Sequence, residues 1–278
     1  MAKNEKNEVA IQETNPVCAY NYGKYAGAGN EETDRDDFKI PFVYLINYGN
    51  PELKEGDPKY VKEAKAGMFI NSVTRQLYAP GDLFVVPCHT RQRFVEWVPR
   101  RQGGGYVTEY EKSNPIVQEA IAANDGKINK DLKNPKNGND LVQTFTVYAL
   151  RMHGVDDTEP GEMIVIPCTS SKVSRYKEIR TRLGTVKGAA DRPLFANRLV
   201  LSSTSELDKK SGERYMNVKF SPAISDDVGA SLMDPAKFGA VIEAAAAFQS
   251  AVKGGLAQAD YSSVGRDASG DPEGDDVF

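Results

Sequence analysis

The most informative stretch of the sequence reads Arg91-Gln92-Arg93-Phe94-Val95-Glu96-Trp97-Val98. Its polar and apolar residues alternate, and in an extended chain alternate side chains share one face. One face therefore carries Arg93 together with Trp97, the only tryptophan, while Phe94 and Glu96 point to the other. The stretch predicts a half-buried β-strand that presents a positive charge beside a large aromatic ring.

A glycine-rich turn follows directly and reads Pro99-Arg100-Arg101-Gln102-Gly103-Gly104-Gly105-Tyr106. Glycines let the backbone approach a ligand closely. Arginines neutralise phosphates, and aromatic rings can stack on bases. This mixture predicts contact with a single-stranded nucleic acid, and the alternative is a flexible hairpin loop with solvated arginines. The residues expected to make the contact here are Arg91, Arg93, Trp97, Arg100, Arg101 and Tyr106.

Further strand and helix signals lie on both sides of this region. Apolar or alternating runs bounded by turn residues predict strands at residues 38–46, 67–74, 81–87, 141–152, 194–202 and 214–221. Apolar residues at helical spacing predict helices at residues 116–123, 171–183 and 235–253. Asn114 and Asp234, each followed by a proline, are expected to cap the first and the third of these helices. Residues 124–140 form a polar insertion, which is expected to be a surface loop. Together these signals predict a mostly β chain with a few helices, a β-rich α+β fold.

A weak internal similarity links residues 80–88 (PGDLFVVPC) to residues 160–168 (PGEMIVIPC). Each segment reads as a Pro-Gly turn that leads into a buried strand ending at a proline. The pair could mark a duplicated half-domain. It could equally be one turn chemistry used twice, and the second interpretation is favoured because the flanking residues diverge.

The most basic stretch of the chain is the helix predicted at residues 171–183. Its positive side chains include Lys172 and Arg175, and Glu178 is the single acidic residue among them. The strand at residues 214–221 adds Tyr215 and Lys219 on the face opposite its apolar residues. A small β-barrel uses such an arrangement to stack a base and hold its phosphate. Two interpretations of the helix stay open: a surface that faces DNA or docks the tail, and a solvated face.

Length, charge and cysteine content bound the class of protein. The chain has 278 residues and a formal net charge of −4. Residues 260–278 hold six carboxylates against one arginine, so the remainder is nearly neutral and must cluster its basic groups to bind nucleic acid. Three widely spaced cysteines disfavour a disulfide framework and favour the cytoplasm. Neither a signal peptide nor a membrane span is expected.

The last residues form an acidic tail that ends on an aromatic side chain. Residues 260–278 are rich in Asp, Gly and Ser, which predicts disorder, and they close with Gly274-Asp275-Asp276-Val277-Phe278. This tail resembles the C-terminus of bacterial and bacteriophage single-stranded DNA-binding proteins. The predicted hairpin at residues 194–221, whose turn contains Lys and Gly, is a second and weaker point of similarity.

The resemblance implies an OB-like barrel with insertions at residues 38–254, between a flexible arm at residues 1–37 and a disordered, acidic, partner-binding tail at residues 255–278. It implies sequence-independent binding of single-stranded DNA in phage replication or recombination, within the infected bacterial cell. Asp275, Asp276, Val277 and Phe278 would recruit replication proteins such as a polymerase, helicase or primase. The tail would also compete with DNA for the basic groove, and a homo-oligomer is compatible with this interpretation.

The sequence offers no recognisable catalytic, cofactor or metal motif, so a non-enzymatic protein without a cofactor is expected. Cys88 and His89 with Cys168 match zinc-site spacing poorly. Acidic pairs at residues 36–37, 156–157 and 226–227 would suit a two-metal nuclease, but each lies in a turn-like context and is read as a solvated loop. The main alternative is a phage virion or scaffold protein that self-assembles and has no role with DNA.

Overall fold

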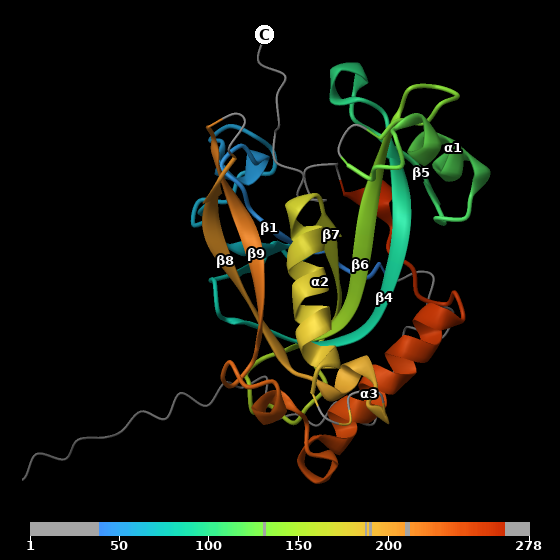
Figure 1. The fold of residues 1–278 in the computed structure, drawn as a ribbon. Helices are drawn as coiled ribbons and strands as arrows, with labels where there is room; N and C mark the ends of the chain where they lie inside the picture. Colours follow the sequence, from blue (N-terminus) through green and yellow to red (C-terminus); the bar gives the residue numbers. More distant parts are fainter. Residues whose placement is uncertain (1–38, 130–131, 187, 189–190, 209–211, 265–278) are drawn as a thin grey trace, which may run out of the picture. The chain divides into compact units, whose positions relative to one another are not determined.

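The computed structural model describes residues 39–129, 132–186, 188, 191–208 and 212–264 (Figure 1). The expected arm at residues 1–37 and residues 265–278 of the expected tail lie outside the described residues. The described part of the chain forms three α-helices and two antiparallel β-sheets. The predicted fold class, mostly β with a few helices, is confirmed.

The larger sheet has six strands in the order β7-β6-β4-β8-β9, with β5 paired to β4. Its strands are β4 (Leu83–Trp97), β5 (Tyr106–Tyr110), β6 (Asp140–Met152), β7 (Met163–Thr169), β8 (Leu199–Leu207) and β9 (Arg214–Pro222). Strands β7 and β9 stand at the two ends of this order, and no ladder joins them among the described residues. The expected OB-like barrel is therefore not formed there, because the sheet stays open.

Strand β4 runs through a proline at which the sequence predicts an end. Proline lacks the backbone N–H that a central strand would donate. A β-bulge shifts the register between Pro87 and His89, and this irregularity lets the strand continue to Trp97. Strand β7 likewise passes through Pro167 while it pairs with β6. The expectation that these strands end at proline is wrong.

A smaller three-stranded sheet, in the order β1-β2-β3, adjoins the larger one. Its strands are β1 (Val43–Leu45), β2 (Phe69–Asn71) and β3 (Leu77–Tyr78). A parallel bridge pairs Phe42 with Val165 of β7, and the Val165 N–H donates to the Pro41 carbonyl over 2.9 Å. Both faces of β1 are buried, which accounts for the continuous apolar run in this part of the sequence.

Two of the three helices begin at caps that the sequence predicts. Asn114 and Asp234 accept hydrogen bonds from the backbone N–H groups of Ile116 and Ala236, and a proline follows each cap. The helix at residues 171–183 is confirmed as well. The predicted strand at residues 194–202 begins later, because residues 194–196 form a 3-10 turn. The helices are α1 (Pro115–Ala123), α2 (Ser171–Gly184) and α3 (Pro235–Lys253).

Helices α2 and α3 cover opposite faces of the larger sheet (Figure 1). Apolar residues of α3, among them Phe248, pack with β4 and β6 in what we call the α3-side core. Tyr176 of α2 and its apolar neighbours pack with β6, β7 and β9 in the α2-side core. Along β6, Val147 and Ala149 belong to the α2-side core and Tyr148 to the α3-side core, as the alternation predicts.

The two similar segments at residues 80–88 and 160–168 contribute to β4 and β7 on either side of β6. Their corresponding residues face opposite cores. Cys88 lies in the α3-side core and Cys168 in the α2-side core. This reversal disfavours a duplicated half-domain. It favours the interpretation that the same turn chemistry is used twice. It also places the two cysteines considered for a zinc site on opposite faces of the sheet.

The polar insertion is fastened to β4 by the carboxylate of Glu96, which is 1% exposed. Its Oε1 accepts hydrogen bonds from the amides of Asn137 (2.8 Å) and Asn139 (2.6 Å). Its Oε2 accepts from the Tyr110 hydroxyl (2.7 Å) and the Asn134 amide (3.0 Å). Burial raises the pKa of Glu96, but the four hydrogen bonds outweigh it and hold the pKa below its ordinary value.

The fold continues beyond the boundary expected at residue 254. Tyr261 is 2% exposed and Val264 is 7% exposed, and both belong to the α3-side core. The Tyr261 hydroxyl shares a hydrogen bond of 2.7 Å with the hydroxyl of Thr146. The expectation that the tail begins at residue 255 is therefore wrong for residues 255–264, because an aromatic anchor ties this segment to the sheet.

Candidate nucleic-acid interface

The structure encloses the tryptophan that the sequence predicts as a stacking partner for bases. Trp97 is 1% exposed and lies in the α3-side core. The ring of Tyr106 meets it edge-on at 5.9 Å and stacks on Tyr261 at 6.3 Å. A base cannot reach the buried indole, so the expected role of Trp97 does not fit its position. Tyr106 is half-buried, and one of its faces is occupied by Tyr261.

The arginines at this end of β4 are placed differently from one another. Arg93 is half-buried and forms ion pairs with Glu109 (3.7 Å) and Glu111 (3.1 Å). These carboxylates lie in and next to β5, so the β4–β5 hairpin already supplies counter-charge to Arg93. Arg100 and Arg101 lie in a 3-10 turn between the two strands, and Arg101 is exposed. The glycine-rich hairpin therefore offers fewer available positive charges than the sequence indicates.

Strand β4 has a gap along one edge. On that edge β8 pairs with residues 83–85 and β5 pairs with residues 94–97, while β6 lies along the other edge. Residues 86–93 thus have no strand partner on the outer edge among the described residues. Helix α3 covers part of the gap, where the Gln249 amide donates to the Cys88 carbonyl over 3.1 Å.

Basic side chains from three elements gather at this gap. Arg91 of β4 donates a hydrogen bond to the Val252 carbonyl near the end of α3. Burial lowers the pKa of His89, and the positive charges of Arg91, Lys253 and Arg180 lower it further. Arg180 belongs to the basic helix for which the sequence leaves a DNA-facing role open. Sequence reasoning missed Lys253 and His89 as parts of a basic group, because nothing in the sequence indicates that the end of α3 approaches this stretch of β4.

Helix α2 turns two of the expected DNA-binding residues toward the fold. Lys172 is 4% exposed. Arg175 forms an ion pair with Glu206 of β8. The same carboxylate accepts hydrogen bonds from the Tyr215 hydroxyl (2.8 Å) and the Asn217 amide (3.1 Å). Burial raises the pKa of Glu206, but the hydrogen bonds from these three donors outweigh it and leave the pKa below its ordinary value. Glu206 thus holds both Arg175 and Tyr215.

The outer side of α2 nevertheless carries several exposed cations. Lys177, Arg180 and Lys219 of β9 are exposed, and among the described residues none of the three forms an ion pair. The ammonium of Lys177 lies over the ring of Phe145, 5.5 Å from its centroid. A hollow of about 140 Å³ opens between α2 and the β8–β9 hairpin. Arg175, Arg182 and Lys219 line this hollow, whereas Arg180 lines another hollow on the other flank of the helix. We call the basic side chains on both flanks of α2, together with Lys219, the α2 surface: Arg175, Lys177, Arg180, Arg182 and Lys219.

The structure therefore unites some of the expected residues and separates others. Arg175, Tyr215 and Lys219 meet at the α2 surface, and Arg91 lies at the gap in β4, near enough to Arg180 for both to act on His89. Trp97, Arg93, Arg100, Arg101 and Tyr106 belong to the β4–β5 hairpin instead. The expected partner-binding residues, Asp275, Asp276, Val277 and Phe278, lie outside the described residues.

Other kinds of site find little support in the described part of the chain. No group of three His, Cys, Asp or Glu side chains there is arranged to hold a metal ion. Burial raises the pKa of the Cys88 and Cys168 thiols to about 12 each, so both are protonated at neutral pH. None of the described helices is both long and apolar enough to cross a lipid bilayer.

Comparison with known proteins gives one match. Searches of curated proteins and of solved structures returned none. A family model described as Pam3 phage gp34-like protein matches residues 11–258, which cover most of the chain. The match supports the bacteriophage part of the expected resemblance and says nothing about DNA. On this match, the chain belongs to the Pam3 phage gp34-like protein family.

Proposed function

We propose that this protein binds single-stranded DNA without sequence preference, as a non-enzymatic component of phage DNA replication or recombination. The observation that carries the proposal is the α2 surface. Lys177, Arg180 and Lys219 are exposed there without ion-pair partners among the described residues, in a chain whose formal net charge is negative. Concentrating positive charge around one helix is what a nearly neutral body requires to attract a polyanion.

The chemistry of this surface suits phosphates better than base edges. Arginine can hold a phosphate with two parallel hydrogen bonds, and lysine acts as a point charge. The gap in β4 extends the positive region through Arg91 and Lys253. Contacts of this kind give affinity that is independent of sequence and falls as salt releases the condensed counterions. The acidic tail would recruit replication proteins such as a polymerase, helicase or primase.

The test is a binding titration at several salt concentrations. Because Trp97 is buried, its fluorescence is a poor reporter, and the anisotropy of a labelled oligo-dT is the better signal. Lys219→Ala should reduce the slope of log K against log salt by about 0.7, the value for one phosphate contact to a single strand. Lys62→Ala removes an exposed lysine from the segment at residues 54–66 and serves as the matched control. Absence of binding at low salt would refute the proposal.

Self-assembly into a virion or scaffold is the second candidate function. Strand β9 pairs only with β8 among the described residues. On its other edge the Met216 N–H donates to the Asn47 side chain over 2.7 Å, and the rest of that edge would offer backbone groups to another copy of the chain. Exposed Leu207 at the end of β8 adds apolar surface beside it. Light scattering with and without oligonucleotide separates the two candidates. Large oligomers that ignore DNA would favour the scaffold.

A further inference from the structure

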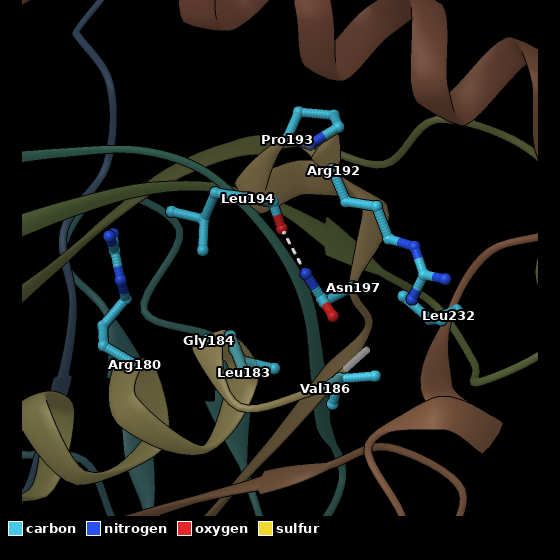
Figure 2. Close-up of a pocket in the computed structure, with 9 residues that line it drawn as sticks. All are labelled: Arg180, Leu183, Gly184, Val186, Arg192, Pro193, Leu194, Asn197 and Leu232. Carbon is cyan, nitrogen blue, oxygen red and sulfur yellow. Dashed lines mark hydrogen bonds between the residues drawn. The ribbon is translucent and has the colours of Figure 1, made fainter. Parts of the chain in front are cut away.

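A second hollow lies at the C-terminal end of α2, on the opposite flank from the hollow at Lys219. It measures about 130 Å³ and is formed by the last turn of α2, residues 192–197 and Leu232 (Figure 2). Pockets for drug-sized ligands measure roughly 300–1,000 Å³. This hollow is therefore matched to one small group rather than to a large ligand.

Part of the wall of the hollow is apolar and belongs to the packed fold. Leu183 belongs to the α2-side core, and Val186 and Leu194 pack against that core. An antiparallel bridge joins Asn197 to Leu232. The faces of a planar, weakly polar group would contact these apolar side chains.

The polar groups of the hollow fall into two sets. Arg180 and Arg192 stand on opposite sides of it (Figure 2). Between them, the Asn197 amide nitrogen donates to the Leu194 carbonyl over 3.0 Å, and the Asn197 Oδ1 accepts no hydrogen bond from the described residues. No carboxylate side chain is among the residues that form the hollow. The C-terminal end of α2 adds the partial negative charge of a helix dipole.

This distribution discriminates between ligands. A lone phosphate placed inside would meet the negative end of the helix and the Asn197 oxygen. A base with an exocyclic amino group would instead donate to that oxygen while its faces contact the apolar walls. The phosphates on either side of the base would then meet Arg180 and Arg192, which are suited to bidentate contact with phosphate.

We propose that this hollow is a subsite for one nucleotide whose base carries an exocyclic amino group, with its 5′ and 3′ phosphates on the two arginines. This inference rests on the proposed function, because the bound single strand is what supplies the nucleotide. Arg180 belongs both to this hollow and to the α2 surface. At this one position the protein would consequently favour adenine, cytosine or guanine over thymine, while the phosphate contacts along the rest of the strand stay independent of sequence.

The test uses deoxyadenosine 3′,5′-bisphosphate, thymidine 3′,5′-bisphosphate and inorganic phosphate as probes of the full chain in calorimetric titrations. The adenine compound should bind about fivefold more tightly than the thymine compound, the size of one neutral hydrogen bond. Arg192→Ala should weaken both compounds about tenfold, the size of a charge-assisted contact. Val186→Phe should fill the hollow and abolish the preference for adenine. Lys62→Ala should change nothing.

Two results would overturn the subsite: inorganic phosphate competing as well as the bisphosphates, or wild-type affinity in Arg192→Ala. Arg192 is exposed, so its variant keeps the test decisive even where Val186→Phe fails to fold. The two proposals fail separately. If the protein binds oligonucleotides but not the bisphosphates, the subsite alone is overturned. If it binds the bisphosphates but not oligonucleotides, the subsite is supported and the proposed function is overturned.

Discussion

Replacing Glu206 with glutamine should strengthen DNA binding while it weakens the fold. Glu206 holds Arg175 in an ion pair and accepts hydrogen bonds from Tyr215 and Asn217. Because glutamine has no charge and only one acceptor oxygen, Arg175 loses its main partner at the α2 surface. The guanidinium then becomes available to a phosphate, and a negative charge that repels DNA is removed at the same time.

The magnitudes follow from the position of the pair. The side chain of Arg175 is 41% exposed and that of Glu206 is 24% exposed, so solvent screens the pair and its loss should cost about 1–2 kcal/mol of unfolding free energy. That corresponds to a fall of roughly 2–8 °C in Tm for a chain of this size. One added phosphate contact should steepen the slope of log K against log salt by about 0.7.

The assay is oligo-dT anisotropy at several salt concentrations, with thermal unfolding in parallel. Glu119→Gln removes an exposed carboxylate from α1 and is the control, for which neither affinity nor Tm should change. In the double variant Glu206→Gln with Arg175→Ala, the gain in affinity should vanish, since the two residues act as one unit. A lowered Tm with unchanged affinity and slope in Glu206→Gln would refute a role for Arg175 in binding.

Three further predictions concern the fold and the tail. Glu96→Gln should lower the unfolding free energy by about 2–4 kcal/mol relative to Glu119→Gln, because the NH2 group of the buried Asn134 would face the NH2 group of glutamine in place of a carboxylate oxygen. Equal unfolding free energies for the two variants would contradict this. As the folded pKa of Glu96 lies below its ordinary value, its stabilisation is present at neutral pH and lost as pH falls through the folded pKa, so the difference between wild type and Glu96→Gln should narrow in acid. Tyr261→Ala should cost about 3–5 kcal/mol in urea unfolding, and a cost near zero would show that residues 255–264 add nothing to the core. Truncation after Val264, which keeps this anchor, should raise oligo-dT affinity at low salt; unchanged affinity would make the tail a solubiliser only.

The sequence predicts well those features that depend on neighbouring residues. Two examples are the cap formed by Asn114 before Pro115 and the alternation of side chains along β6. Each depends only on residues a few positions apart in the sequence. They need no knowledge of the rest of the fold, because helical and extended backbones impose their own periods on the side chains. Pro87 shows the limit of such rules, since whether a proline ends a strand depends on the register of the neighbouring strand.

The candidate site is predicted less well, because availability depends on what packs over a residue. The face that carries Trp97 is indicated correctly, but Tyr261 from the far end of the chain lies against that face. Lys172 belongs to the most basic stretch of the sequence and is still buried. Lys253 has no local signal at all, and only the approach of α3 to β4 places it near Arg91.

Glu96 and Glu206 each accept hydrogen bonds from three or more side chains, but their donors differ, and this difference decides which carboxylate can influence binding. Glu96 is surrounded by neutral amides and a hydroxyl, so its network fixes the insertion and offers nothing to a phosphate. Glu206 holds a cation at a surface where other cations are exposed. An arriving phosphate can replace it as the partner of Arg175, because both are anions with acceptor oxygens. If the α2 surface binds DNA as proposed, Glu206 competes with it, and its presence should set an affinity lower than the surface could otherwise reach.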